Sequence, residues 1–508
     1  MQIDPTLVDK AAIESALRAE LSLRRRALPP DSVAIALTSR EEEVAEWICD
    51  RLVGNFAPTS EEIVAVNKGR HGVRPIAVWD LSSRVLYRML AERVQPALPA
   101  LRRSRDDWLA FQRAPLRKDG RYIVTSDIAA CYQYIDHGLL RDELLVQTGE
   151  FDTVSTLVAL LCEVSGKDYG LPQQSFASDV IAEPFLARLE RALTRRGLEV
   201  DRYNDDFRFS CSGWSEVVRA IEVLEEESRR VGLTVNDLKT ITWSRAKYEA
   251  QLDEADSLRD EISGEAELDL ETEYDSEIDA EDGDDRDSGE EFPDSVNRLA
   301  AERVLERWAR IAGRRGEVSS RRRIEHRVTV ELIPSALAAL GELSGTSKEI
   351  LNYCIRLLKF ERTVTPSVGT YLTRVHDDGK VLESFDYLLR SKTYLNGWQT
   401  WWLQQPVARL SGFASGAGAR GRVKWARDSY ASGEYASILR AETARTLARH
   451  RMIELDELLK LYERSSNIVR PVLAGAIALL KPSGNIRRAI VDDDKLNMWA
   501  YEWAARWS

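Results

Sequence analysis

The chain has 508 residues, of which 44% are hydrophobic, and this composition is typical of a globular protein with several domains. Its formal net charge is −12, and it has no run of about 18 uncharged apolar residues, which argues against a membrane-spanning helix. Five scattered cysteines without a CxxC pair argue against a disulfide framework or a zinc site. The first residues lack the basic and apolar regions of a secretory signal, so we expect a cytoplasmic protein.

Residues 1–60 are expected to form a helical segment. Ser39 and Glu42 have the spacing of a capping box, which predicts a helix that continues through Arg51. Residues 74–79 (RPIAVW) then predict a short strand, and the following aspartate, Asp80, is placed to cap an amphipathic helix.

Strand and helix patterns continue to alternate up to residue 248. Residues 121–128 predict a strand, and Asp136 is placed to cap the helix after it. The same patterns predict, further along, a helix over 175–196, two strands around a polar turn over 200–211, a helix over 215–231 and a strand pair near TVNDLKTITW. Because the order lacks regular βαβ repetition, we expect residues 61–248 to form an α+β domain.

An acidic segment over residues 249–297 separates the two halves of the chain. Residues 251–294 contain 21 acidic and 2 basic residues, so the remainder holds 69 basic and 62 acidic residues and is mildly basic, as nucleic-acid binding would need. Dense like charge with few aromatic residues predicts a disordered linker. The linker is interpreted as a solvated spacer, and the alternative is a mimic of nucleic acid that occupies a basic groove until substrate displaces it.

Residues 298–508 are dominated by hydrophobic residues at helical spacing, joined by short Gly, Ser or Thr turns. This pattern predicts an all-α C-terminal domain, either solenoid-like or an irregular bundle. We find no clean internal repeat, so a regular repeat array is not predicted.

Three aspartates stand where strands are predicted to present them. Asp127 follows a strand pattern, and Asp205 and Asp206 occupy the turn between two strand patterns. Adjacent carboxylates repel each other and lose hydration when they are buried, and a bound metal removes this cost. Oxygen ligands suit Mg²⁺, and two ions about 3.5–4 Å apart can hold the attacking and leaving oxygens of a phosphoryl transfer. The pattern therefore predicts a two-metal site for nucleotidyl transfer.

Four segments in order resemble the palm motifs of reverse transcriptases: DIAACYQYIDH, GLPQQSFASDVIAEPFL, RYNDDFRF and GLTVNDLKT. Upstream, RPIAVWDLSSRVLYRMLAERVQPAL resembles the fingers segment of that family. The resemblance covers residues 60–245 and implies a fingers and palm region within 61–248. It implies an RNA-directed DNA polymerase, a nucleotidyltransferase that uses two Mg²⁺ ions, with Mn²⁺ as the alternative metal.

The resemblance assigns metal ligands and an acid. Asp127 matches the metal ligand of the first motif, with the Ile128 carbonyl assisting, and Asp205 and Asp206 match the paired carboxylates of the third. Lys239 matches a lysine that protonates the leaving pyrophosphate as a general acid. An ordinary surface lysine is the alternative at this position.

The resemblance also implies nucleotide-binding residues. Tyr132 matches the aromatic residue that rejects a ribose 2′-hydroxyl, and Gln173 matches a glutamine beside the incoming nucleotide. Arg70 and Arg74 are candidates for binding the triphosphate, because guanidinium groups form paired hydrogen bonds with phosphate oxygens. A core tyrosine and unrelated surface arginines are the alternatives.

Two positions depart from the family pattern: Gln174 stands where Gly is usual, and Asn204 where Ala, Val or Met are commoner. The wording of the motifs and the long helical domain resemble the abortive-infection and defence-associated bacterial reverse transcriptases. In that group untemplated synthesis, priming from a tyrosine hydroxyl and oligomeric assembly occur. The resemblance implies dNTPs as substrates, a single-stranded DNA product, a homo-oligomer and no membrane partner. It leaves open an RNA template and the identity of a primer among 16 tyrosines.

Two C-terminal motifs have competing interpretations. Residues 396–405 (NGWQTWWLQQ) cluster three tryptophans that can stack on single-stranded bases, although helix packing is the commoner role. Arg445 and His450 have the RxxxxH spacing of small helical ribonucleases, which an arginine-rich chain also produces by chance.

Three functions follow from these patterns. The first is a defence polymerase, the second a helical-domain ribonuclease or scaffold with a secondary palm, and the third a template-dependent reverse transcriptase of a mobile element. The chain lacks the basic maturase region and nuclease cluster of the mobile-intron relatives, which argues against the third. The residues that make up the motifs favour the first function, the defence polymerase.

Overall fold

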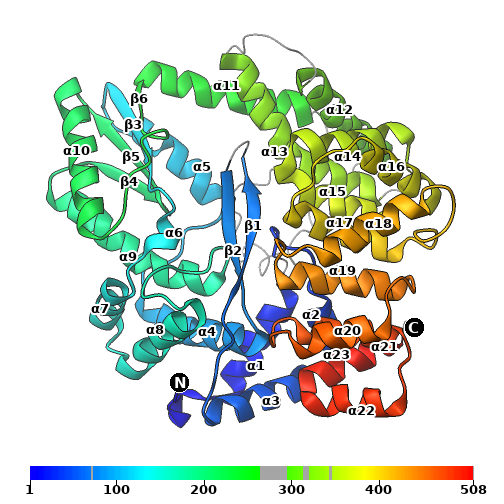
Figure 1. Cartoon of the computed structure of the whole chain (residues 1–508). Coiled ribbons are helices and arrows are strands. Elements are labelled where there is room, and N and C mark those ends of the chain that lie inside the picture. Colours follow the sequence, from blue (N-terminus) through cyan, green and yellow to red (C-terminus); the bar gives the residue numbers. More distant parts are fainter. Residues whose placement is uncertain (24, 70–71, 264–293, 313–319, 343–345, 507–508) are drawn as a thin grey trace.

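The computed structural model describes residues 1–508 except 24, 70–71, 264–293, 313–319, 343–345 and 507–508. Figure 1 shows three parts side by side: an α/β part on the left, a long β-hairpin in the middle and a helical part on the right. The N-terminal helices lie at the bottom of this view, beside the red helices of the C-terminal part.

Residues 1–60 fold mainly into the helices α1 (Lys10–Ser22), α2 (Ser32–Leu37) and α3 (Glu41–Val53). The helix predicted through Arg51 is confirmed by α3. Its N-cap is Arg40, which makes no side-chain capping bond, so the predicted capping box of Ser39 and Glu42 is wrong. The helix begins later than that box requires. The three glutamates of its first turn stabilise it instead, because their negative charges lie at the positive end of the helix dipole.

A four-stranded antiparallel sheet with the order β4–β5–β3–β6 forms the centre of the α/β part. Its strands are β3 (Tyr122–Asp127), β4 (Val200–Tyr203), β5 (Asp206–Cys211) and β6 (Ile241–Ser244). They confirm the strands predicted over 121–128 and 200–211. The strand pair predicted near residue 240 is wrong, because Val235 forms only an isolated bridge with Ile128 and β6 alone joins the sheet.

Helices support this sheet and the loops at its end. They are α4 (Leu81–Val94), α5 (Arg105–Arg113), α6 (Cys131–Tyr134), α7 (His137–Thr148), α8 (Phe151–Ser165), α9 (Phe176–Arg195) and α10 (Trp214–Arg230). The helices predicted over 175–196 and 215–231 are confirmed by α9 and α10. Both predicted caps form, since the carboxylates of Asp80 and Asp136 accept hydrogen bonds from backbone N–H groups in the first turns of α4 and α7. Because α10 packs on β3 and β5 and α9 on β4, the sheet is held rigidly.

The hairpin in the middle of Figure 1 consists of β1 (Glu62–Lys68) and β2 (Gly72–Val78), paired antiparallel. The strand predicted over 74–79 is confirmed by β2, whereas β1 was not predicted. Val64, Val66 and Ile76 are buried and share a hydrophobic core with the C-terminal helices. The helical part therefore supports the hairpin that resembles the fingers.

Helix α11 (Arg245–Ser263) connects the sheet to the helical part and crosses the top of Figure 1. It packs against α12 (Asp294–Ala312) and α13 (Ser320–Glu342). The first residues of the predicted disordered linker are therefore helical, because the apolar side chains of α11 repeat at helical spacing and are buried. Residues 264–293 lie outside the described residues.

The C-terminal part is a stack of helices. After α13 these are α14 (Lys348–Phe360), α15 (Thr365–Arg374), α16 (Asp378–Arg390), α17 (Gly397–Arg409), α18 (Ala419–Ala431), α19 (Ser437–Arg449), α20 (Leu455–Glu463), α21 (Arg470–Leu479), α22 (Gly484–Asp493) and α23 (Lys495–Ala505). From α13 to α23 each odd-numbered helix packs against the next odd-numbered helix, and α14, α16 and α18 pack in succession beside them. This arrangement corresponds to the solenoid-like alternative of the predicted all-α domain.

The N-terminal helices pack against the last helices of the stack. Trp47 and Trp499 meet edge to face, with ring centroids 6.0 Å apart. Polar contacts at this junction join Arg40 to Glu502 at 2.9 Å, Arg51 to Asp494 at 3.3 Å and Ser32 to Glu442 at 2.9 Å. The molecule is therefore a closed ring of contacts, from the N-terminal helices through the sheet, α11 and the helical stack back to the N-terminal helices.

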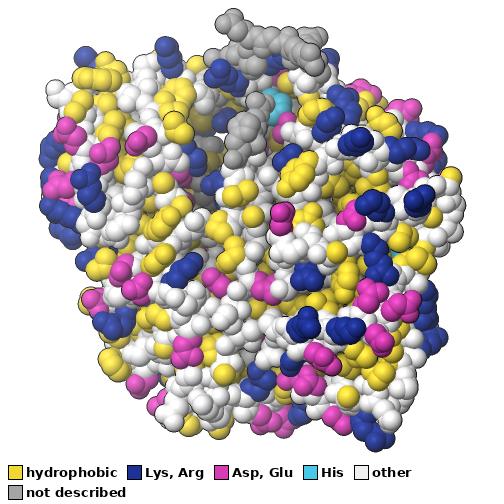
Figure 2. All heavy atoms as spheres, viewed as in Figure 1, with side chains coloured by type: hydrophobic (Ala, Val, Ile, Leu, Met, Phe, Trp, Pro, Cys, Tyr) yellow, Lys and Arg dark blue, Asp and Glu magenta, His cyan; other side chains and the backbone are white. Residues whose placement is uncertain are grey.

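Figure 2 shows acidic and basic side chains interspersed over the visible face, with hydrophobic side chains between them. Among the described helices, none is both long enough and apolar enough to cross a membrane.

Candidate active site

Strands β3 and β5 bring the three predicted aspartates together. Asp127 ends β3 and lies opposite Asp206, the first residue of β5, in the antiparallel register. Asp205 precedes β5, and its carbonyl accepts a hydrogen bond of 3.1 Å from the Ile128 N–H. Carboxylate oxygens of the three aspartates lie within 4.8 Å of one another. The sheet register, rather than a flexible loop, sets this spacing.

Asp205 is an unfavourable place for a negative charge. Burial, and then the neighbouring carboxylate of Asp127, raise its pKa to about 6. The cations Lys68 and Arg103 oppose this shift only in part. The surroundings of Asp205 therefore disfavour its ionised form.

The turn that carries Asp205 is held from behind. Asn204 has a left-handed backbone with φ of 53°, which asparagine adopts more readily than most residues. The carbonyl of Asn204 accepts a hydrogen bond of 3.1 Å from Arg202, which also forms ion pairs with Glu183 and Glu190 of α9. Helix α9 thus fixes the hairpin that presents two of the three aspartates.

The three carboxylates fit a divalent metal. They offer only oxygen ligands, they converge within 4.8 Å, and Asp205 lacks sufficient neutralising charge. Hard cations that prefer oxygen ligands match this donor set. The aspartates could therefore hold a divalent ion, and Mg²⁺ remains the predicted one.

Lys239 lies at the same site. Its Nζ is 3.1 Å from Asp127 Oδ2 and its side chain is 44% exposed, and its role as the general acid stays a prediction. Asn236 also contacts Asp127, with its Nδ2 donating to Oδ2 at 3.2 Å and its N–H donating to the Asp127 carbonyl at 2.8 Å. We did not predict Asn236, although its place in NDLKT, three residues before Lys239, was a signal that it shares the turn.

Tyr132 lies next to the triad and is buried, with 9% of its surface exposed. Its hydroxyl donates a hydrogen bond of 2.5 Å to Asp179 Oδ1 on α9. Its carbonyl accepts a hydrogen bond of 2.7 Å from Leu171, on the loop that carries Gln173. The structure thus places Tyr132 and the Gln173 loop side by side, and their nucleotide-binding roles stay predictions.

The loop before α9 has a tightly specified path. Gly170 has φ of 94°, and a Cβ at this position would lie 3.1 Å from the Gln133 carbonyl oxygen. The His137 ring, whose pKa is lowered by burial, donates to the Gly170 carbonyl at 2.7 Å. Gln174 has φ of 56°, a left-handed conformation that glycine adopts freely, which accounts for the glycine that is usual at this position in the family.

The two arginines predicted to bind the triphosphate have different outcomes. Arg70 lies outside the described residues. Arg74 is half-buried on β2 and pairs in register with Val66. Lys68 at the end of β1 is close enough to Asp205 to oppose the rise of its pKa, which burial and Asp127 cause. Lys68 is therefore a cation of the site that we did not predict, because we did not recognise β1.

The three tryptophans of residues 396–405 are core residues. Trp398, Trp401 and Trp402 are 2%, 6% and 5% exposed. The indole N–H groups of Trp398 and Trp402 both donate to the Ala27 carbonyl. The interpretation as a base-stacking surface is wrong, because these rings pack α17 against the N-terminal segment.

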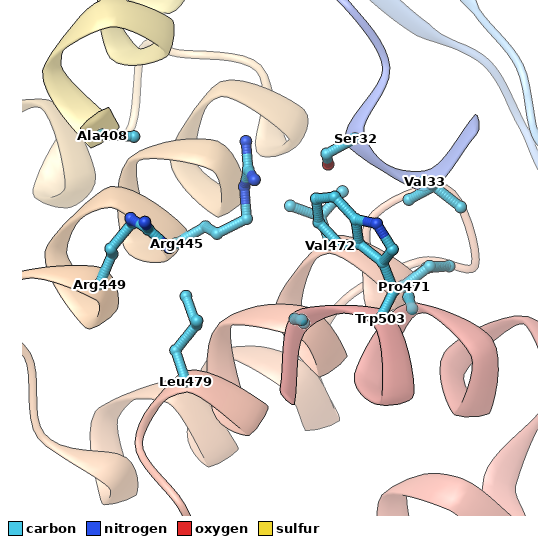
Figure 3. A pocket seen from close by; sticks show the side chains of 12 residues that line it. Ser32, Val33, Ala408, Arg445, Arg449, Pro471, Val472, Leu479 and Trp503 are labelled. Carbon is cyan, nitrogen blue, oxygen red and sulfur yellow. The ribbon is translucent and has the colours of Figure 1, made fainter. Parts of the chain in front are cut away.

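Arg445 and His450 are held by different partners. Arg445 forms an ion pair of 2.8 Å with Glu442 and lines a largely apolar cavity of about 50 Å³ together with Trp503 (Figure 3). The His450 ring donates to the Val407 carbonyl at 3.0 Å, and burial lowers its pKa. Arg445 lies on α19 and His450 is its C-cap, and a shared ribonuclease role for the two residues stays a prediction.

The part of the chain that contains the sheet matches a known protein family. The reverse transcriptase (RNA-dependent DNA polymerase) family matches residues 66–258. Among solved structures, the chain is similar to a telomerase from Candida tropicalis in complex with a fragment of telomeric RNA, with 12% identity over 76% of this chain and 67% of that chain and a TM-score of 0.27. No curated protein matches the chain.

The family match includes the end of β1, all of β2, the four-stranded sheet and all three aspartates. The four resembling segments and the shared carboxylate site lie inside the matched residues. Residues 66–258 are thus a reverse transcriptase domain, and the chain is a nucleotidyltransferase of the RNA-directed DNA polymerase class.

Proposed function

We propose that this chain makes DNA as part of an antiphage abortive-infection response in the bacterial cytoplasm. The observation that carries the polymerase assignment is the convergence of Asp127, Asp205 and Asp206 within 4.8 Å on two paired strands. The defence role is supported by the wording of the motifs and by the long helical stack after the domain. Deoxynucleotides are the proposed substrates, and single-stranded DNA is the proposed product.

Each residue of the site has a part in this proposal. The three aspartates, with the Ile128 carbonyl, would hold two Mg²⁺ ions, and Mn²⁺ is the alternative. Bound there, such ions supply charge stabilisation for phosphoryl transfer. Lys239, whose Nζ lies 3.1 Å from Asp127, would give a proton to the leaving pyrophosphate.

The remaining predicted residues surround the nucleotide. Tyr132 would contact its sugar, and Gln173 would lie beside it. Arg70, Arg74 and the newly found Lys68 would bind the triphosphate, since guanidinium and ammonium groups bind phosphate oxygens.

We further propose that synthesis needs neither template nor nucleic-acid primer, and that a tyrosine hydroxyl of the protein starts the chain. Support comes from the resemblance to the defence group and from the two departures at Gln174 and Asn204. Four tyrosines of the described part are well exposed and are the first candidates for priming: Tyr134, Tyr169, Tyr387 and Tyr394, at 53%, 41%, 57% and 70%.

The test is synthesis from purified protein with Mg²⁺ and each labelled dNTP, without nucleic acid. An Asp205→Asn/Asp206→Asn double variant is the matched control, because it keeps side-chain size and removes two charges. We expect product from the wild type alone, resistant to ribonuclease and shifted in size by protease.

Other results would redirect the assignment. Activity only after addition of an RNA template and primer would move the enzyme to the templated class. Equal product from the double variant would remove Asp205 and Asp206 from the mechanism. Light scattering during size-exclusion chromatography tests the proposed homo-oligomer, which a monomeric mass would contradict.

A further inference from the structure

The Tyr132 hydroxyl, on α6, forms hydrogen bonds with side chains from three other parts of the chain. It donates to Asp179 Oδ1 on α9 at 2.5 Å and shares this hydrogen with Asn204 Oδ1, on the β4–β5 turn, at 3.3 Å. It accepts a hydrogen bond of 3.1 Å from Arg103 Nη2, on the segment before α5. Both the hydrogen and a lone pair of this oxygen are therefore in use within the protein.

The partners of this hydroxyl also hold one another. Arg103 Nη2 lies 3.8 Å from Asp179 Oδ1, and the Arg103 side chain is only 2% exposed. A hydrogen bond to a charged group contributes about 1.5–3 kcal/mol, more than one between neutral groups. The Tyr132 ring is therefore fixed by charge-assisted bonds at its tip as well as by packing around its body.

Burial of the Arg103 side chain lowers the stability of the fold. Its Nε and Nη1 atoms are buried and have no hydrogen-bond partner among the described residues. A buried donor without a partner costs about 1–3 kcal/mol. Local costs of this kind are typical of functional sites, where geometry matters more than stability. Among the described residues, the hydrogen bond of Arg103 goes to the Tyr132 hydroxyl, which indicates that the arginine serves to hold Tyr132.

The network is continuous with the aspartate site. Asn204 directly precedes Asp205, and Tyr132 follows Asp127 on the short helix after β3. Asn204 is also one of the two departures from the usual family pattern. In this chain the departure supplies a polar atom to the Tyr132 hydroxyl, which Ala, Val or Met could not do.

We propose that Arg103, Asp179 and Asn204 are positioning residues that immobilise the Tyr132 ring, and that this immobility sets how strongly the enzyme rejects ribonucleotides. The inference rests on the proposed function, in which Tyr132 contacts the sugar of the incoming nucleotide. A ring that cannot shift collides with a 2′-hydroxyl, whereas a ring released at its tip can move aside and admit ribose. The hydroxyl faces the protein interior, so it acts by anchoring the ring.

The experiment compares kcat/KM for a dNTP and for the matching rNTP, and takes their ratio as the discrimination. Tyr132→Phe removes the anchor and keeps the ring, and Asp179→Asn removes the charge that binds both Arg103 and the hydroxyl. We expect each change to lower discrimination about tenfold, the effect of one lost charge-assisted bond. Asn204→Ala should lower it less, because its 3.3 Å contact is the weakest of the set.

Tyr87→Phe is the matched control. The Tyr87 hydroxyl is also buried, and its hydrogen-bond partner is Ser178 Oγ at 3.0 Å, one residue before Asp179. This variant should also lose stability, though less because its bond joins neutral groups, and it should keep the wild-type discrimination. A purely structural role for the Tyr132 network would instead make all the variants alike in discrimination.

The outcomes separate the inference from the proposed function. If the wild type makes DNA and discriminates, but Tyr132→Phe and Asp179→Asn discriminate equally well, the inference is wrong and the polymerase assignment stands. A wild type that uses rNTPs and dNTPs equally would also overturn the inference alone. A wild type that polymerises no nucleotide would overturn the proposed function, and the inference with it.

Discussion

At the scale of single residues, the charge of Asp205 determines how the domain responds to pH. Burial and Asp127 raise its pKa from 3.8 to about 6, so the fold favours the protonated form. This contribution to stability is fully present below about pH 4 and is lost as the pH rises through about 6. At neutral pH the ionised carboxyl therefore opposes folding unless a cation neutralises it.

Asp205→Asn should stabilise the metal-free protein while it abolishes synthesis. We expect the free energy of unfolding at pH 7.5 in chelator to rise by about 1–2 kcal/mol, a value reduced because the carboxyl is only half-buried. The gain should disappear near pH 4, where the wild-type carboxyl is already protonated. Thermal unfolding of both proteins across this pH range is the measurement.

Added Mg²⁺ provides the control for this variant. The wild type should gain stability from the ion at pH 7.5, and Asp205→Asn should gain less, because one ligand has lost its charge. A stability difference that stays constant from pH 4 to pH 7.5 would show that the effect is not electrostatic.

The sequence supported the prediction of some site residues and not of others, for a physical reason. Asp127, Asp205 and Asp206 each stand at the end of a strong strand pattern, so local chemistry reveals them. Arg103 and Asp179 act on Tyr132 through contacts between distant segments, and no local pattern encodes such pairings. The tryptophans of residues 396–405 show the same limit, since stacking on bases and packing in a core need the same side chains.

At the scale of elements, the loop from Tyr169 to Gln174 joins the aspartate site to α9. It is tied to the Tyr132 and Ile135 carbonyls through N–H bonds of 2.7 and 2.8 Å from Leu171 and Gly170. With φ of 94° at Gly170 and the Gln133 oxygen 3.1 Å from an added Cβ, this path disfavours a side chain at that position.

Gly170→Ala should therefore displace the loop and reduce nucleotide addition. We expect a loss of stability of about 1–3 kcal/mol from the strained backbone and the close Gln133 oxygen, and a clear fall in kcat/KM for dNTPs. Gly166→Ala is the control, since Gly166 also has positive φ, 67°, but open space around a Cβ. It should lose about 1 kcal/mol and keep its activity, so equal activity losses in the two variants would contradict this account.

Two elements show how composition can hide a pattern. The acidic composition of residues 249–263 led to the prediction of a linker, yet Ala255, Leu258 and Ile262 recur at intervals of three and four and are buried in α11. In β1, Val64 and Val66 alternate with exposed residues, which is a strand pattern. In α11 the charged neighbours obscured the periodicity, whereas in β1 the apolar Ile63 and Ala65 between the buried valines hid the alternation.

At the scale of the whole molecule, the reverse transcriptase domain and the helical stack share their cores. Val64, Val66 and Ile76 of the hairpin belong to the core of the stack, and Leu496 and Trp499 of the stack belong to the core of the domain. The division into a polymerase and a separate C-terminal unit, which the sequence suggested, therefore describes the order of the chain better than its packing.

A protease site inserted within residues 264–293 tests this sharing. After cleavage, the two fragments should stay together during size-exclusion chromatography, because each buries apolar side chains of the other. They should also remain bound in about 1 M salt, which screens ion pairs such as Arg40–Glu502 but not apolar packing. Fragments that separate at moderate salt would show that surface charges hold the ring together.

The closed ring has a consequence for how the enzyme is made. Arg40 and its partner Glu502 are separated by 462 positions in the chain, and Trp499 completes the packing around Trp47. Until the ribosome has synthesised the C-terminal helices, the N-terminal helices keep part of their apolar surface exposed. A chain that ends before the helical stack would contain all three aspartates but would lack the helices that pack against the β1–β2 hairpin. The contacts between the N-terminal helices and α23 can therefore form only after α23 has been synthesised.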